Sequence, residues 1–238
     1  MVQGVDSGPD LNGRTVGADA QALAQAALDL HTQRSSIQLT SEAVTTAAVR
    51  LIHGADGASV ALLAGNGTVR SNVSTDALAA AMQGIQDDVG EGPTRQSLRT
   101  RETVLVCDLR GETRWTRFTS AAVDNTEARS VLALALCAGT DVLGALTVHS
   151  RAIGAFSAHA VAGATALAAH CALALMTSTH EEQFARALAS RDAIGQAKGM
   201  IMERYNIDAQ QAFAMLSTIS QNTNTPVKVL AERLTSRR

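Results

Sequence analysis

Residues 191–204 read Arg191-Asp192-Ala193-Ile194-Gly195-Gln196-Ala197-Lys198-Gly199-Met200-Ile201-Met202-Glu203-Arg204, which places two glycines in a helix-forming run. A glycine inside a helix costs about 1 kcal/mol relative to alanine, so Gly195 and Gly199 need a reason such as the close approach of another backbone. The same run holds Lys198, one of only two lysines in the chain, and the other is Lys228. The segment therefore predicts a helix with a specialised surface.

The two cations of this segment share one side of the predicted helix. At about 100° per residue, Arg191 and Lys198 lie one heptad apart, within an apolar arc. The arc is formed by Phe184, Leu188, Ile194, Ile201, Met202 and Tyr205. Two interpretations remain open on these residues alone. A phosphate backbone could approach the glycines and meet both cations, or a neighbouring helix could pack there while the cations extend into solvent.

The segment belongs to a long predicted helix that begins after Ser157, a plausible N-cap, and runs to Tyr205 without a proline. A helix of this length cannot bury its whole surface on one small domain. We therefore expect its middle to pair with the same helix of a second subunit, which makes the protein a homodimer.

Two short helices follow it. Asp208 and Gln211 form a capping-box pattern, and Thr225-Pro226 reads as an N-cap followed by proline at the first helical position. The expected apolar stripes are Ala212, Phe213, Leu216 and Ile219, then Val227, Leu230, Ala231 and Leu234. With the end of the long helix they form a three-helix bundle whose core is too small to offer a catalytic cleft.

The region before the long helix has mixed periodicity. Residues 1–17 are predicted to be a disordered leader. Helices are predicted at 18–34, 41–53 and 76–87, with another short helix after Gly90-Glu91-Gly92-Pro93. Strands are predicted at 58–63, 68–73, 103–107, 131–138 and 142–149, with a hairpin turn at Asn66-Gly67. Helices flanking an antiparallel sheet give an α+β fold.

The charge is unevenly distributed along the 238 residues. Residues 1–180 hold 12 basic and 16 acidic side chains, a net charge of −4, whereas residues 181–238 hold 8 and 6, a net charge of +2. This charge is too small for nonspecific binding of nucleic acid. Any nucleic-acid recognition must therefore depend on a few residues at specific positions. The apolar runs are too short to cross a bilayer and no signal peptide is evident, so we expect a cytoplasmic protein with no membrane partner.

Motifs for catalysis and metal binding are missing from the sequence. It contains no Gly-x-Ser-x-Gly, P-loop, HExxH or GxGxxG pattern, so we expect no enzymatic activity. Cys107, Cys137 and Cys171 are widely spaced and are interpreted as small buried apolar residues. His159 and His170 would lie about 16 Å apart along one helix, too far to share an ion. We expect no metal and no cofactor.

The C-terminal residues resemble the ANTAR domain, the three-helix RNA-binding module of bacterial transcription antiterminators. The matching residues are Arg191, Ile194, Gln196-Ala197-Lys198-Gly199-Met200-Ile201-Met202, Ala212-Phe213, Leu216, Ser220-Gln221, Asn224, Val229 and Arg233. The resemblance implies binding to paired RNA hairpins that compete with a terminator stem, and dimerisation that presents two modules. The implied contacts are Arg191, Gln196, Lys198 and Gly199. Arg204 extends this surface, and Lys228 is added for its charge alone.

The earlier residues resemble the GAF domain that is fused to ANTAR in actinobacterial regulators. The matching residues are Gly90-Glu91-Gly92-Pro93, Val104, Asp108-Leu109, Arg114-Trp115, Phe118, Arg129-Ser130-Val131-Leu132, Gly144-Ala145-Leu146, Gly154 and Phe156. The resemblance implies a sensor of a small molecule, of redox state or of an upstream signalling protein. Thr94 stands where a cysteine is common, which weakens a thiol switch. We interpret Asp108 and Trp115 as turn and core residues.

These observations predict a leader at 1–17, a GAF-like sensor domain at 18–160, a connecting coiled-coil helix at 161–182 and an ANTAR domain at 183–238. The main hypothesis is an RNA-binding antitermination regulator whose sensor acts through the long helix. One alternative is a dimeric protein-interaction or signalling module without RNA binding. Another is a haem or metal sensor, which would show a visible absorption band or bound metal.

Overall fold

A computed structural model describes residues 21–22, 25–26, 28, 36–64 and 67–236. The chain divides into two compact units, Met1–Thr179 and His180–Arg238. The predicted leader at 1–17, most of the predicted helix at 18–34 and Asn66 of the predicted turn lie outside the described residues.

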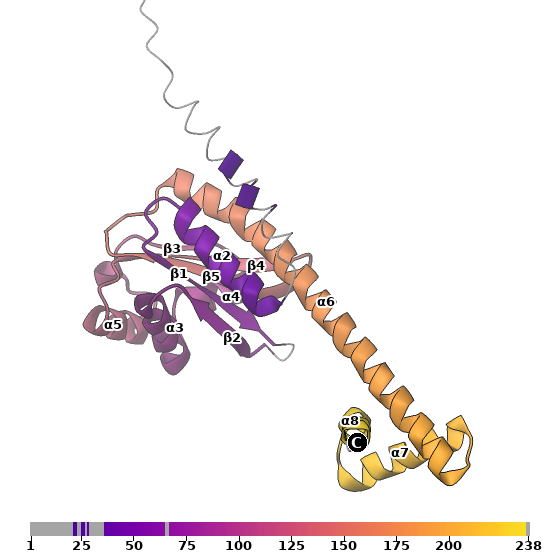
Figure 1. Ribbon diagram of the computed structural model, residues 1–238. Helices are drawn as coiled ribbons and strands as arrows, with labels where there is room; N and C mark the ends of the chain where they lie inside the picture. The colour runs from indigo at the N-terminus through magenta and orange to yellow at the C-terminus, as the bar shows by residue number, and fades with distance from the viewer. Residues whose placement is uncertain (1–20, 23–24, 27, 29–35, 65–66, 237–238) are drawn as a thin grey trace, which may run out of the picture. The chain divides into compact units, whose positions relative to one another are not determined.

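Unit 1 is an α+β domain (Figure 1). Its helices are α2 (Ile37–Leu51), α3 (Ala77–Val89), α4 (Pro93–Thr100), the 3₁₀ turn η1 (Leu109–Gly111), α5 (Thr116–Asn125) and the first part of α6 (Ala158–Tyr205). Its strands are β1 (Gly57–Leu63), β2 (Val69–Ser74), β3 (Val104–Val106), β4 (Ser130–Ala138) and β5 (Asp141–Ser150). The helix α5 was not predicted, whereas the five predicted strands are confirmed to within one residue at each end.

The strands form one antiparallel sheet in the order β2-β1-β5-β4-β3. One face, which includes Val60, Leu134 and Leu146, packs against α2 and the first part of α6. The opposite side holds a second apolar cluster that includes Trp115 and Phe118, beside α3 and α5. Trp115 is buried, as its interpretation as a core residue predicts.

A buried polar network links α3 and α4 to the sheet. The Gln86 side-chain amide donates to Thr94 Oγ1 at 2.9 Å, and the Thr94 N–H donates to Gln86 Oε1 at 2.8 Å. Thr94 Oγ1 also lies 2.8 Å from Thr147 Oγ1 on β5. All three side chains are buried, so these bonds satisfy groups that would be costly to leave unpaired. Thr94 therefore has a structural role. It occupies the position at which a cysteine is common in the GAF domains that this region resembles.

The helix α6 contributes to both units. Its N-cap is confirmed, because the Ala160 N–H donates to Ser157 Oγ at 3.2 Å. Among the described residues it is the one helix long and apolar enough to cross a membrane by length and composition, so the prediction that the apolar runs are too short to do so is wrong for this helix. Leu167, Cys171 and Leu175 lie fully buried in the core of unit 1. Packing in the core of unit 1 therefore accounts for part of its apolar character.

Unit 2 consists of the end of α6, α7 (Ala209–Thr223) and α8 (Val227–Thr235). Its core is formed by Ala197, Ile201, Ala212, Leu216 and Ala231. The capping box is confirmed, since Asp208 Oδ1 accepts from the Gln211 N–H at 2.8 Å and Gln211 Oε1 accepts from the Asp208 N–H at 3.2 Å. These contacts fix the entry into α7 and hence its position beside α6.

Two positions of the predicted apolar stripe on α7 are wrong. Phe213 and Ile219 are exposed. The physical reason is that alanines let the three helices approach closely, so the buried stripe is narrow and excludes the large residues beside it. Thr225 is also not the N-cap of α8, because the helix begins after Pro226.

The cysteine interpretation is correct for Cys171 and wrong for Cys107. Cys171 is buried, and burial raises the pKa of its thiol to about 12. Cys137 is half-buried, whereas Cys107 is exposed just after the short strand β3. The three thiols therefore differ in their exposure to solvent, which their spacing in the sequence does not predict.

Candidate nucleic-acid interface

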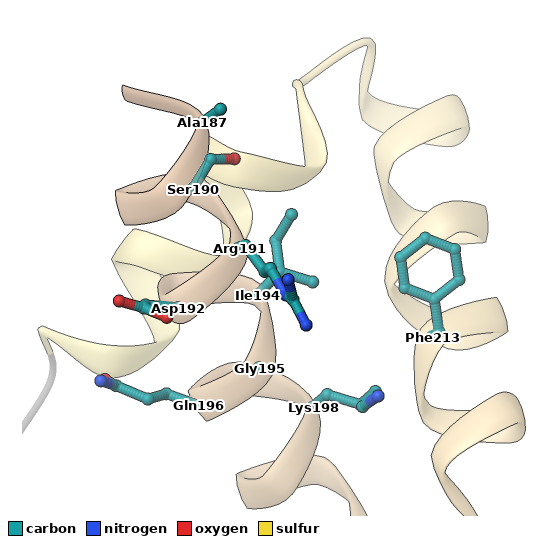
Figure 2. Close-up of a pocket in the computed structure, with 9 residues that line it drawn as sticks. All are labelled: Ala187, Ser190, Arg191, Asp192, Ile194, Gly195, Gln196, Lys198 and Phe213. Carbon is teal, nitrogen blue, oxygen red and sulfur yellow. The ribbon is translucent and has the colours of Figure 1, made fainter. Parts of the chain in front are cut away.

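A hollow of about 780 Å³ lies between α6 and α7 within unit 2 (Figure 2). It is lined by Ala187, Ser190, Arg191, Asp192, Ile194, Gly195, Gln196, Lys198 and Phe213. All but Phe213 come from α6, and the capping box of α7 sets the position from which Phe213 enters. The hollow combines two cations, an aromatic ring and a glycine.

The charges in the hollow are arranged asymmetrically. Arg191 and Lys198 lie on the side of α6 that faces Phe213, whereas Asp192 and Gln196 point to the other side of the helix (Figure 2). Arg191 is exposed and Lys198 is half-buried. Neither side chain has an ion pair within the part of the chain that the structure describes. Uncompensated cations on a concave surface favour an anionic partner.

The two glycines face open space. A Cβ added at Gly195 or at Gly199 would meet no atom within 4 Å among the described residues. Close packing of another described helix therefore does not explain why these positions are glycines. The open space leaves both glycines accessible to a molecule outside this chain, such as a nucleic acid or a second copy.

The structure brings together three of the six predicted contact residues. Arg191, Gln196 and Lys198 line the hollow, although Gln196 does so from the far side of α6. The other three lie outside its lining. Gly199 and Arg204 are exposed on α6, and Lys228 lies on α8, where its Nζ is 3.7 Å from Glu232 Oε1.

Phe213 is the residue of this surface that sequence reasoning misplaced. Its side chain is 47% exposed and lines the hollow, although its position beside Ala212 suggested the core. The signal was available in the helical period. The buried direction of α7 is set by Ala212 and Leu216, four residues apart, and Phe213 projects about 100° from Ala212. An exposed phenylalanine that faces two cations across a hollow can stack on a base.

The described residues of unit 1 include no cluster of metal-ligating side chains. Groups of three or more His, Cys, Asp or Glu side chains able to hold an ion do not occur among residues 36–64 and 67–236 or the few described before them. Asp108 is confirmed as a turn residue, since it caps η1 and its carboxylate accepts from Arg129 at 3.0 Å. The pKa of the Asp108 carboxyl is lowered, first by the hydrogen bond that it accepts from the Arg110 N–H. The Arg129 guanidinium lowers the pKa of this carboxyl further.

The fold consists of an α+β domain joined by one helix to a small three-helix module that carries the hollow. Comparison with protein families agrees with this division. A GAF domain matches residues 35–176, and an ANTAR domain matches residues 182–234. The chain therefore belongs to the GAF domain family, and its GAF domain is followed by an ANTAR domain.

Solved structures support the fold of unit 1. The GAF domain of an Acinetobacter phosphoenolpyruvate-protein phosphotransferase is 14% identical, with a TM-score of 0.52, over 68% of this chain and 95% of that one. Free methionine-R-sulfoxide reductase from Neisseria meningitidis is 13% identical, with a TM-score of 0.53, over 76% of this chain and 99% of that one. At these identities the likeness concerns the fold alone. A search of curated proteins found no match.

Proposed function

We propose that this protein is an RNA-binding regulator of transcription antitermination, in which the GAF domain senses a signal and the ANTAR domain binds paired hairpins in nascent RNA. In this proposal it acts in the cytoplasm and is not an enzyme. The family match supports the regulatory class, and the hairpin ligand is the ligand that the resemblance implies.

The observation that carries the proposal is the convergence of Arg191, Lys198 and Phe213 on one open hollow. Two unpaired cations suit two phosphates of an RNA backbone, and the ring offers a stacking surface. The open space at Gly195 and Gly199 lets a backbone approach α6 closely. The net charge of residues 181–238 is only +2, so these placed residues rather than a broad basic field must supply the affinity.

A homodimer is part of the proposal. Phe184 is 73% exposed and Leu188 is also exposed, and both lie on α6 one turn apart. Exposed apolar residues at helical spacing suit a coiled-coil seam with the same helix of a second copy. Pairing of α6 would present two RNA-binding surfaces, as binding of paired hairpins requires.

The proposal is tested by crosslinking RNA to the full-length protein in cells and sequencing what is bound. Enrichment of paired hairpins in transcript leaders is the expected result. Bound RNA should also bind the purified protein, with lower affinity when one hairpin of the pair is deleted. A folded protein that recovers no RNA above background would instead support the protein-interaction module, for which the exposed residues Phe184 and Leu188 are the favouring observation.

A further inference from the structure

A second arginine-lined surface lies in unit 1, in addition to the hollow of unit 2. Three arginines from three separate segments line a hollow of about 350 Å³: Arg110 in η1, Arg129 just before β4 and Arg151 just after β5. Thr126 and Glu127 complete its polar lining. Three guanidinium groups from segments distant in the sequence thus line one hollow.

Arg129 is held rigidly in this hollow. Its Nε and Nη2 donate to the Asp108 carboxylate at 3.0 to 3.1 Å, and its side chain is 23% exposed. Its Nη1 donates to no partner in the described part of the chain, so one edge of the guanidinium remains available. A guanidinium fixed by a carboxylate on one edge is preorganised to bind an anion with the other.

The other two arginines keep unused donors as well. The Arg110 guanidinium has no hydrogen bond or ion pair among the described residues. Arg151 donates through Nε to Glu127 Oε2 at 3.1 Å, but this pair is exposed and contributes little, so an anion can replace Glu127 there. Asp108, Glu127 and Asp56, whose Oδ2 accepts from the Arg151 N–H at 2.7 Å, match the three arginines in number. An anion would therefore be bound by the unused guanidinium donors and not by an excess of positive charge.

The carbonyl groups at the end of α5 are already hydrogen-bonded within the helix. Thr126 caps the helix, with its N–H and its hydroxyl both donating to Ala122 O, at 3.0 and 2.6 Å. The Asn125 side chain donates to Ala121 O at 2.8 Å. Because these acceptors are satisfied locally, they compete less for the guanidinium donors.

We propose that this hollow binds a small molecule bearing phosphate groups, with Arg110, Arg129 and Arg151 as its ligands. Guanidinium groups pair bidentately with phosphate oxygens, and the volume exceeds that of a single phosphate, which suits a diphosphate or a phosphate ester. The bound phosphate compound would then be a signal that the GAF domain senses. That regulatory role rests on the function proposed above, whereas the binding itself does not.

The test is calorimetric titration of the full-length protein with inorganic pyrophosphate at fixed ionic strength and without divalent cations. Wild type is expected to bind one equivalent, and Arg110→Ala and Arg151→Ala are each expected to weaken binding about tenfold. Arg99→Ala is the matched control, because Arg99 is an exposed arginine on α4 outside the hollow. Arg129→Lys keeps the charge but removes the planar guanidinium, and it should also weaken binding.

Three results would overturn the inference: no heat of binding with wild type, unchanged affinity in both Arg110→Ala and Arg151→Ala, or an equal loss in Arg99→Ala. Circular dichroism of each variant verifies folding. RNA binding is measured separately on the same samples. If the protein binds pyrophosphate but no RNA, only the proposed function fails, and if it binds RNA but no pyrophosphate, only this site fails.

Discussion

Lys198 of α6 and Phe213 of α7 line the same hollow, with the lysine half-buried and the ring close to half exposed (Figure 2). A cation beside an accessible ring can hold a phosphate while the attached base stacks. The relationship depends on α7 being fixed against α6 by the small core around Ala197 and Ala212.

Lys198→Ala is expected to weaken hairpin binding and to lower the slope of log affinity against log salt by about one, because one phosphate contact is lost. Fluorescence anisotropy at several salt concentrations measures both. Arg186→Ala is the control, since Arg186 is exposed on α6 and pairs with Glu182 outside the hollow. An unchanged slope in a folded Lys198→Ala protein would remove this lysine from the interface.

Phe213→Leu is expected to reduce RNA affinity while stability changes little. Stacking of a base on an aromatic ring is worth about 1–3 kcal/mol, and leucine keeps apolar bulk without the ring face. Tyr205→Leu serves as the control, because Tyr205 is an exposed aromatic on α6 outside the hollow. If both variants bind RNA like wild type, stacking at Phe213 does not occur.

Gly199→Ala is expected to stabilise unit 2 by about 0.5–1 kcal/mol, because the position is helical and the added Cβ meets nothing within 4 Å. If RNA approaches this glycine, the same change weakens binding, so stability and affinity move in opposite directions. Gly163→Ala is the control, as an exposed glycine of α6 in unit 1 with equally open space.

The bulkier Gly199→Leu separates the two interpretations of the glycines. Loss of the dimer with RNA binding retained by the remaining monomer would assign Gly199 to helix pairing. Loss of RNA binding in an intact dimer would assign it to the RNA surface. Sedimentation and anisotropy on the same sample give both answers.

Phe184→Glu is expected to convert the dimer to monomer at micromolar concentration, because two like charges would meet in the proposed seam. Sedimentation equilibrium measures the change. Gln183→Glu adds the same charge about 100° around α6 and should leave the dimer intact. A wild-type protein that is monomeric throughout this range would exclude pairing through this face.

Local patterns predicted much of the fold. The five strands are alternating or apolar runs bounded by turn residues, and Asp208 with Gln211 marks the start of α7 in the sequence itself. The helix α5 was not predicted because its start has no local capping signal: the side chain of Trp115, at the N-cap, makes no capping hydrogen bond. Instead Glu91 Oε1 accepts from the N–H groups of Arg117 and Phe118, and a cap supplied from so far along the chain leaves no local signal.

The candidate site was predicted only in part, for a similar reason. The positions of Arg191 and Lys198 on one side of α6 follow from the helical period. The position of Phe213 in the hollow depends on how α7 packs against α6. Because the core of unit 2 consists largely of alanines, the apolar pattern of α7 does not distinguish a buried phenylalanine from one beside the core.

His149 gives unit 1 a dependence on pH. The side chain is buried on β5, and Nε2 has no hydrogen-bond partner within the described residues. Burial lowers the pKa of His149, and Arg151 lowers it further, while Asp76, 3.8 Å away, and Asp56 oppose this effect. As the pH falls below the ordinary histidine pKa of about 6.5, the unfolded chain takes up a proton that the folded state does not.

The free energy of unfolding of unit 1 is therefore expected to decrease between pH 7 and pH 5, by at most about 1.4 kcal/mol per pH unit. Denaturant unfolding followed by the fluorescence of Trp115, the single tryptophan, reports this unit. His149→Gln should flatten the dependence, whereas His53→Gln, at an exposed histidine, should leave it as in wild type. The carboxyl groups whose pKa is lowered, such as Asp56 and Glu112, change the free energy of unfolding only at lower pH. If His149→Gln shows the same dependence of stability on pH as wild type, His149 is not its source.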